Sequence, residues 1–113
     1  MSSCLFCRIA AGTLGTKVAE GPDWCAFDDI APQAPTHVLV IPKRHVASLN
    51  GAADADDALL GRLLRAARDL AKARGIADRG YRLVCNTNAE GGQSVAHLHV
   101  HLLGGRQMTW PPG

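Results

Sequence analysis

The sequence of 113 residues lacks the features that mark several large classes of protein. It has no run of basic residues and no arginine stripe, and its formal net charge is only +2. Binding to nucleic acid or to a membrane surface through bulk charge is therefore not expected, although a single anionic ligand is compatible with this charge. No apolar stretch approaches the length of a membrane span, and residues 1–12 do not have the pattern of a signal peptide. We expect a cytoplasmic protein without nucleic-acid or membrane partners.

Internal repeats, low-complexity tracts and linkers are also missing, and the length suits one hydrophobic core. We therefore expect a single domain over residues 1–113. Neither common phosphate-binding loop occurs, because GxGxxG after a strand and GxxxxGK followed by Ser or Thr are both absent. The four cysteines fit a reduced protein better than a disulfide scaffold. Two of them, Cys25 and Cys85, lie inside expected strands and are interpreted as small buried residues.

The local pattern predicts one short helix and one long helix. Ser2 or Ser3 is expected to cap the short helix over about residues 4–11, and Asp54 to cap the long helix over about residues 55–74. The long helix has an apolar stripe that is typical of a core face or a dimer face. The stripe consists of Leu59, Leu60, Leu63, Ala66, Ala67, Leu70 and Ala71.

Short apolar runs between turn signals predict five strands. They are expected at residues 18–20, 24–27, 37–41, 81–86 and 96–103. Residues 30–36, which contain two prolines, and residues 87–92 are expected to be loops. Three successive strands, one long helix and two further strands favour an α+β fold with an antiparallel sheet.

Three of the five histidines, His97, His99 and His101, alternate along the last expected strand. Because successive side chains of a strand point to opposite faces, the three imidazoles would share one face. They would then place groups that can act as nucleophile, proton donor or metal ligand on one wall near neutral pH. This clustering favours a catalytic or metal site over a polar, solvated strand face.

A glycine-rich loop precedes these histidines. Gly91 and Gly92 allow backbone N–H groups to approach an anion, and Gln93 and Ser94 add side-chain donors. Alone the loop is explained as well by an ordinary turn, but next to three histidines it predicts an oxyanion pocket. A neutral imidazole is nucleophilic near pH 7, and no carboxylate cluster stands beside the strand to hold magnesium. We therefore expect nucleotidyl transfer through a histidine adduct, without a catalytic metal.

A CxxC motif formed by Cys4 and Cys7 lies in the short helix. At this spacing the two sulfur atoms face the same side of a helix, where one ion could bridge them. His45 and His97 are the candidates for the two further ligands of a tetrahedral, structural zinc ion. A redox-active dithiol and two small core residues are the alternatives.

Taken together, these motifs resemble the histidine triad (HIT) superfamily, and within it the Hint branch of histidine triad nucleotide-binding proteins. The resemblance covers nearly the whole chain through residues 4–9, 27–45, 91–106 and 110–113. It implies a HIT-like α+β fold, in which a five-stranded antiparallel meander sheet carries one short N-terminal helix and one long helix. It also implies a homodimer with a continuous ten-stranded sheet and the long helices at the interface.

The resemblance further implies a purine nucleoside phosphoramidase that also accepts acyl-adenylates, with an AMP-type or GMP-type nucleotide as the bound group. His99 would be the nucleophile on the α-phosphorus, and His101 and His37 would contact the phosphate. Ser94 would assist the leaving amine and hold a phosphate oxygen. His97 would support the triad or bind zinc.

The implied nucleotide contacts extend over the rest of the chain. Asp29 would hold the ribose hydroxyls, and Asn86 would contact the ribose or the phosphate. Four residues would form the wall around the base: Phe6, Ile9, Phe27 and Ile30. The alternatives to an enzyme are a nucleotide-binding or partner-binding regulatory module with only incidental hydrolysis, and a zinc-dependent structural protein.

Trp110 is a large aromatic residue close to the end of the chain, where there is little local core for it to join. We expect it to reach toward the active site of the partner subunit in a homodimer. The alternative is that Trp110 packs against its own domain.

Overall fold

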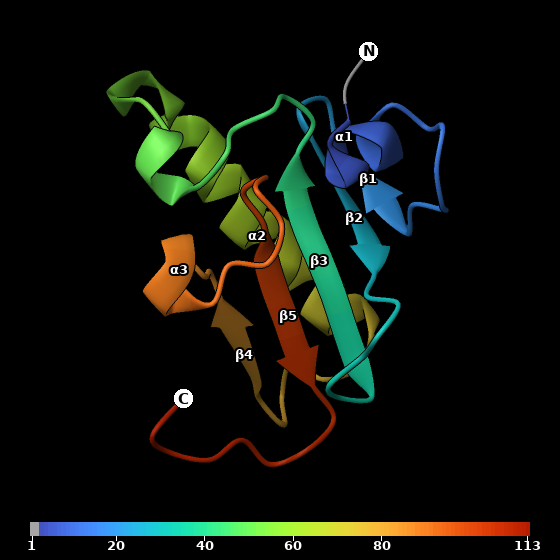
Figure 1. Ribbon diagram of the computed structural model, residues 1–113. Coiled ribbons are helices and arrows are strands. Elements are labelled where there is room, and N and C mark those ends of the chain that lie inside the picture. Colours follow the sequence, from blue (N-terminus) through green and yellow to red (C-terminus); the bar gives the residue numbers. More distant parts are fainter. Residues whose placement is uncertain (1–2) are drawn as a thin grey trace.

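The computed structural model describes residues 3–113 and contains a five-stranded antiparallel sheet with helices on both faces (Figure 1). The expected α+β fold with one short N-terminal helix and one long helix is confirmed. In chain order the elements are α1 (Leu5–Ala10), β1 (Ala19–Glu20), β2 (Trp24–Asp28), β3 (Thr36–Pro42), α2 (Asp57–Ala73), β4 (Tyr81–Val84), α3 (Asn88–Gly91) and β5 (Val100–Gly104). Short 3₁₀ turns at Leu49–Gly51 and Asp54–Asp56 precede α2.

The strand order in the sheet is β1-β2-β3-β5-β4. The first three strands form a meander, and α2 then carries the chain across one face of the sheet to its far edge (Figure 1). The last strand returns between β3 and β4, so the sheet departs from a simple meander at this point. In the resulting register, Leu39 of β3 lies opposite His101 of β5.

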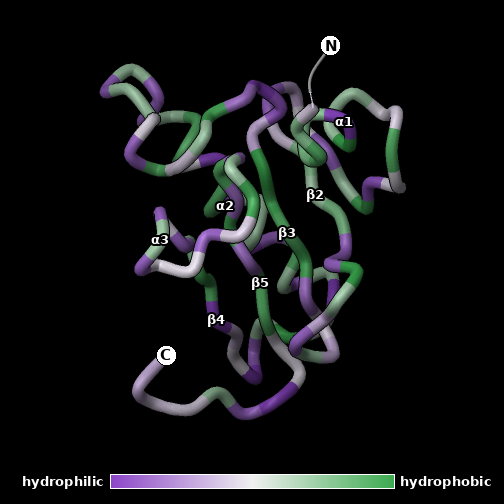
Figure 2. Tube along the Cα trace, viewed as in Figure 1, coloured by the Kyte–Doolittle hydropathy of each residue, from purple (hydrophilic) through white to green (hydrophobic). Residues whose placement is uncertain are grey.

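Strand β3 is buried along its whole length because both of its faces are covered. Its central residues 38–41 are hydrophobic, and the green stretch of β3 in Figure 2 shows this. Val38 and Val40 belong to the core on the α2 face. Leu39 and Ile41 belong to a second core with Phe6 of α1. Because side chains alternate along a strand, His37 lies on the α1 face together with Leu39.

The apolar stripe of α2 packs on the sheet and forms part of the hydrophobic core of this chain. Leu63 is only 1% exposed and contacts the cluster that contains Val100 and Leu102 of β5. This supports the interpretation of the stripe as a core face, although Leu60 is only partly buried. None of the helices in residues 3–113 is long and apolar enough to cross a membrane.

The helices begin differently from what the sequence suggested. The Sγ atom of Cys4 accepts a hydrogen bond from the backbone N–H of Cys7 at 3.4 Å, so Cys4 and not Ser3 caps α1. Ser2 lies outside the described residues. Asp54 does not cap α2, because a 3₁₀ turn intervenes in which the carboxylate of Asp56 accepts the N–H of Ala53 at 2.8 Å.

The last two strands are shorter than expected. Strand β4 ends at Val84, so Cys85 is exposed and the prediction that it is buried was wrong, whereas Cys25 is fully buried. Strand β5 begins only at Val100, because the N–H of Leu98 donates to the carbonyl of Val46 at 2.6 Å instead of joining the sheet.

The loop expected at residues 87–92 also differs, because it contains the helical turn α3. This turn ends at Gly92, whose φ of +78° is a left-handed conformation that glycine adopts without strain.

Candidate functional site

A pocket of about 300 Å³ opens on the α1 face of the sheet. One end is apolar and the other end carries groups that can bind or attack a polar ligand. The apolar end includes Leu5, Phe6, Ile9, Phe27, Ile30 and Leu39. The polar end includes Asp29, Ser94, His99 and His101.

The apolar end has an aromatic floor. Phe6 of α1 and Phe27 of β2 meet edge to face with their ring centres 5.2 Å apart, and both are nearly buried. Ile9 is also buried, whereas Ile30 is 99% exposed and stands at the rim. All four residues that were expected to surround a base therefore line this pocket. A flat apolar ligand of the size of a purine suits such a slot.

A backbone carbonyl determines which ring nitrogen of His99 carries a hydrogen. Its Nδ1 lies 2.7 Å from the carbonyl oxygen of His97. A carbonyl oxygen only accepts hydrogen bonds, so Nδ1 of His99 must carry the proton. In the neutral ring Nε2 then carries the lone pair, and this is the nitrogen that can attack a ligand in the pocket. The ring is 3% exposed and rests against Phe6, with the ring centres 5.2 Å apart.

His101 is oriented through His37. The backbone N–H of Gln33 donates to Nδ1 of His37 at 3.0 Å, so the proton of a neutral His37 is on Nε2. This Nε2 lies 2.9 Å from Nδ1 of His101 and 3.4 Å from a carboxylate oxygen of Asp29. Nδ1 of His101 accepts the proton of His37, and the proton of His101 itself is therefore on Nε2. A neutral His101 thus offers the pocket a hydrogen-bond donor.

The surroundings of His101 keep it neutral. The pKa of His101 is lowered from 6.5 to about 4, mainly by burial and also by His99 and His37, whereas Asp29 opposes the shift. At pH 7 the pocket therefore contains an uncharged His101 beside His99, with ring centres 4.9 Å apart.

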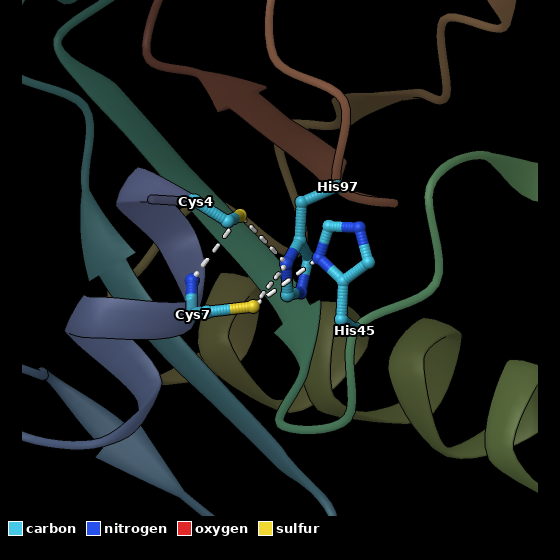
Figure 3. Close-up of side chains that lie close together, drawn as sticks. All are labelled: Cys4, Cys7, His45 and His97. Carbon is cyan, nitrogen blue, oxygen red and sulfur yellow. Dashed lines mark hydrogen bonds between the residues drawn. The ribbon is translucent and has the colours of Figure 1, made fainter. Parts of the chain in front are cut away.

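His97 does not share the wall of His99 and His101, contrary to the expectation of three imidazoles on one face. The cause is that residues 97–99 precede β5, so the alternation of a strand does not apply to them. The ring of His97 is completely buried and points toward Cys4 and Cys7 (Figure 3). Its Nδ1 lies 3.3 Å from Sγ of Cys4 and 3.4 Å from Sγ of Cys7.

Cys4, Cys7, His45 and His97 form a cluster that could hold a metal ion (Figure 3). One ligand atom from each of them lies within 4.8 Å of the other three. Nδ1 of His45 lies 3.2 Å from Sγ of Cys7. Nε2 of His97 donates to the carbonyl of Pro42 at 2.9 Å, which leaves its Nδ1 as a lone pair aimed at the sulfur atoms. Burial also lowers the pKa of His97, which favours the neutral form that binds metals.

Several residues expected at the nucleotide site do not line the pocket. His37 is 6% exposed and lies behind His101. Asn86, Gly92 and Gln93 lie outside the lining as well. The side chain of Gln93 instead connects its loop to the segment after β3, because its Nε2 donates to the carbonyls of Ala47 at 2.7 Å and Val95 at 2.9 Å.

Other residues line the pocket without having been singled out. Leu39 could have been found, because it lies two residues after His37 on the same face of β3. Thr16 comes from the irregular segment between α1 and β1, where no sequence periodicity indicates its direction. The N–H of Gln33 is a backbone group, so its side chain gives no signal of this contact.

Comparisons with known proteins agree with this geometry. A family model described as HIT domain matches residues 14–108. An uncharacterized HIT-like protein of Synechococcus elongatus is 47% identical over 110 residues, which cover 96% of each chain. Among solved structures, a HIT family hydrolase from Legionella pneumophila has 56% identity and a TM-score of 0.95, covering 98% of this chain and 100% of its own. A histidine triad nucleotide-binding protein from Candida albicans has 32% identity and a TM-score of 0.81, with coverages of 96% and 83%.

The lowered pKa of His101 predicts a pH-dependent stability. Between pH 6.5 and pH 4 the unfolded chain takes up a proton on His101 that the folded chain does not. The free energy of unfolding should therefore decrease as the pH falls through this window. Urea denaturation of the wild type and of the His101→Gln variant at several pH values measures the effect.

The His101→Gln variant should lose less stability across this window than the wild type, since it keeps every other titrating group and lacks only this imidazole. Equal pH dependence in the two proteins would contradict the prediction.

Proposed function

The chain belongs to the HIT domain family, and we propose that it is a hydrolase of the Hint type that cleaves purine nucleoside phosphoramidates and acyl-adenylates. The observation that carries the proposal is the hydrogen bond between Nδ1 of His99 and the carbonyl of His97 at 2.7 Å. It makes Nε2 of His99 a nucleophile beside an apolar slot. The name of the Legionella pneumophila relative as a HIT family hydrolase is consistent with this assignment.

In the proposed first step, Nε2 of His99 attacks the α-phosphorus and the P–N bond breaks. The amine leaves with the electron pair of that bond and takes a proton from the hydroxyl of Ser94, which lines the polar end of the pocket. The Nε2–H of His101 donates to a phosphate oxygen, where charge develops in the transition state.

In the second step, water attacks the same phosphorus and the P–Nε2 bond breaks, so the nucleoside monophosphate is released. Ser94 recovers its proton from the attacking water, and His99 returns to its original state. Asp29 at the rim is proposed to accept hydrogen bonds from the ribose, while Phe6, Ile9 and Phe27 enclose the base.

We assign the Cys4, Cys7, His45 and His97 cluster to a structural zinc ion. Two thiolates and two imidazoles are a common ligand set for zinc, and soft sulfur ligands disfavour magnesium and calcium. The zinc would tie α1 to the segment that precedes β5. It would also link α1 to the loop of His45 that follows β3.

We further propose a homodimer. Trp110 is 81% exposed in the single chain, which supports a contact with a second subunit over packing on its own domain. Strand β4 lies at an edge of the sheet, where its outer backbone groups can pair with a second strand. Pairing of β4 with β4 of a second copy would give a ten-stranded sheet.

The His99→Ala variant should lose phosphoramidate hydrolysis by about 10⁴-fold or more, because it lacks the attacking nitrogen. Its affinity for AMP, measured by titration calorimetry, should stay near that of the wild type, because the nucleophile acts only as the transition state forms. Turnover of adenosine 5′-phosphoramidate can be followed by ³¹P NMR in both proteins.

Mass spectrometry of the quenched wild-type reaction should locate a nucleotidyl adduct on His99. An adduct on another residue would remove His99 as the nucleophile. A wild type that binds AMP but does not turn over phosphoramidates would favour the regulatory nucleotide-binding module instead.

Protein purified without added metal or a metal-binding tag should contain about one zinc ion per chain, because thiolate and imidazole ligands hold zinc tightly at pH 7. The Cys4→Ser variant should lose most of this zinc and melt at a lower temperature. The matched control is Cys85→Ser, which changes an exposed cysteine outside the cluster. Elemental analysis and thermal melts measure both effects. Equal zinc content in the two variants would refute the assignment.

Sedimentation at micromolar concentration should show a dimer. Deletion of residues 110–113 should alter the preference for the leaving amine more than it alters the maximal rate on small substrates. The reason is that Trp110 is expected to reach the partner's active site on the side of the leaving group. A monomer, or an unchanged substrate profile after truncation, would count against this arrangement.

A further inference from the structure

Three consecutive hydrogen bonds connect an exposed arginine to the active pocket. Nε of Arg106 donates to the backbone carbonyl of Gln33 at 2.9 Å. The N–H of the same residue, Gln33, donates to Nδ1 of His37 at 3.0 Å. Nε2 of His37 lies 2.9 Å from Nδ1 of His101, which lines the pocket. Arg106 thus reaches the pocket through two backbone groups and one imidazole.

The N–H of Gln33 favours one of two arrangements of the histidine pair, and the carboxylate of Asp29, 3.4 Å from Nε2 of His37, favours the same one. With this donor in place, His37 holds its proton on Nε2, and His101 then holds its proton on Nε2 as well. Without it, His37 can carry its proton on Nδ1 and accept through Nε2. His101 would then donate from Nδ1 and turn a bare lone pair toward the pocket, where it would repel a phosphate oxygen.

The segment that contains Gln33 has two internal side-chain hydrogen bonds, from the N–H of Ala31 to Asp29 at 2.8 Å and from Nε2 of Gln33 to the carbonyl of Ala31 at 3.0 Å, but neither involves the N–H of Gln33. It lies before β3 and includes Pro32 and Pro35, which have no N–H to contribute to backbone hydrogen bonds.

The segment after β5 supports this segment from outside. Besides the bond from Arg106, Gly105 has a φ of +91° and lies so close to Pro35 that a Cβ there would be 2.9 Å from the proline ring.

We propose that Arg106 is a positioning residue, which acts through the backbone of Gln33 and through His37 to keep the Nε2–H of His101 directed at the phosphate of the substrate. The consequence for the rate rests on the proposed function, whereas the effect on the two histidines does not. The side chain of Arg106 is exposed, so its removal leaves the core intact and the variant should fold.

The Arg106→Ala variant tests the proposal, with Arg79→Ala as the matched control. Arg79 lines the same surface hollow as Arg106, but no hydrogen bond joins it to the histidine pair among residues 3–113. ¹⁵N NMR of the imidazole nitrogens distinguishes Nδ1–H from Nε2–H in each histidine. In Arg106→Ala, His37 and His101 should gain a population with the proton on Nδ1, whereas Arg79→Ala should match the wild type.

In phosphoramidate hydrolysis, Arg106→Ala should lower kcat by roughly tenfold to a hundredfold, as expected for a small misplacement of a catalytic group. KM should change less, because Phe6 and Phe27 take no part in the altered hydrogen bonds. The Gly105→Ala variant displaces Pro35 by a different route and should produce the same change in the two histidines.

Unchanged histidine tautomers in Arg106→Ala would overturn the proposal, and so would a kcat equal to that of Arg79→Ala. If the wild type does not hydrolyse phosphoramidates, the proposed function fails on its own. The NMR comparison then still decides whether Arg106 positions His37 and His101.

Discussion

The pocket on the α1 face and the candidate metal cluster both depend on His97. Its ring donates from Nε2 to Pro42 and presents Nδ1 to Cys4 and Cys7. Its backbone carbonyl accepts the Nδ1 proton of His99 at 2.7 Å. His97 is completely buried, so water does not compete for its hydrogen bonds to Pro42 and His99. One residue therefore contacts both cysteines and determines which nitrogen of a neutral His99 carries the lone pair.

This double use is possible only because residues 97–99 are not part of the sheet. In a strand, the carbonyl of His97 would accept from the neighbouring strand and would not be available to a side chain. The N–H of Leu98 instead donates to Val46, and regular pairing begins at Val100 opposite Val40. Because the strand is interrupted, the three histidines point to two different places. His97 points to the cysteines, and His99 and His101 line the pocket.

The sequence predicted the parts of this arrangement that depend on periodicity and on residue chemistry. The β-branched run over residues 37–41 predicted β3, and the CxxC spacing with two imidazoles predicted the cluster of Cys4, Cys7, His45 and His97. The interruption at residues 97–99 was not predictable, because alternating histidines have the same pattern in a strand and in a bend. The tautomers were not predictable either, because they depend on the backbone groups of His97 and Gln33, which carry no side-chain signal.

Helix α1 contributes residues to both the cysteine cluster and the pocket. A helix of six residues is too short to be stable alone, so its position depends on what it packs against. Phe6 lies between Cys4 and Cys7 in the chain and contacts the rings of both His97 and His99, with centres 6.0 Å and 5.2 Å away. Because Phe6 is also part of the apolar end of the pocket, the cysteines that anchor α1 also hold the aromatic floor against His99. The geometry of the pocket is thus inseparable from that of the cysteine cluster.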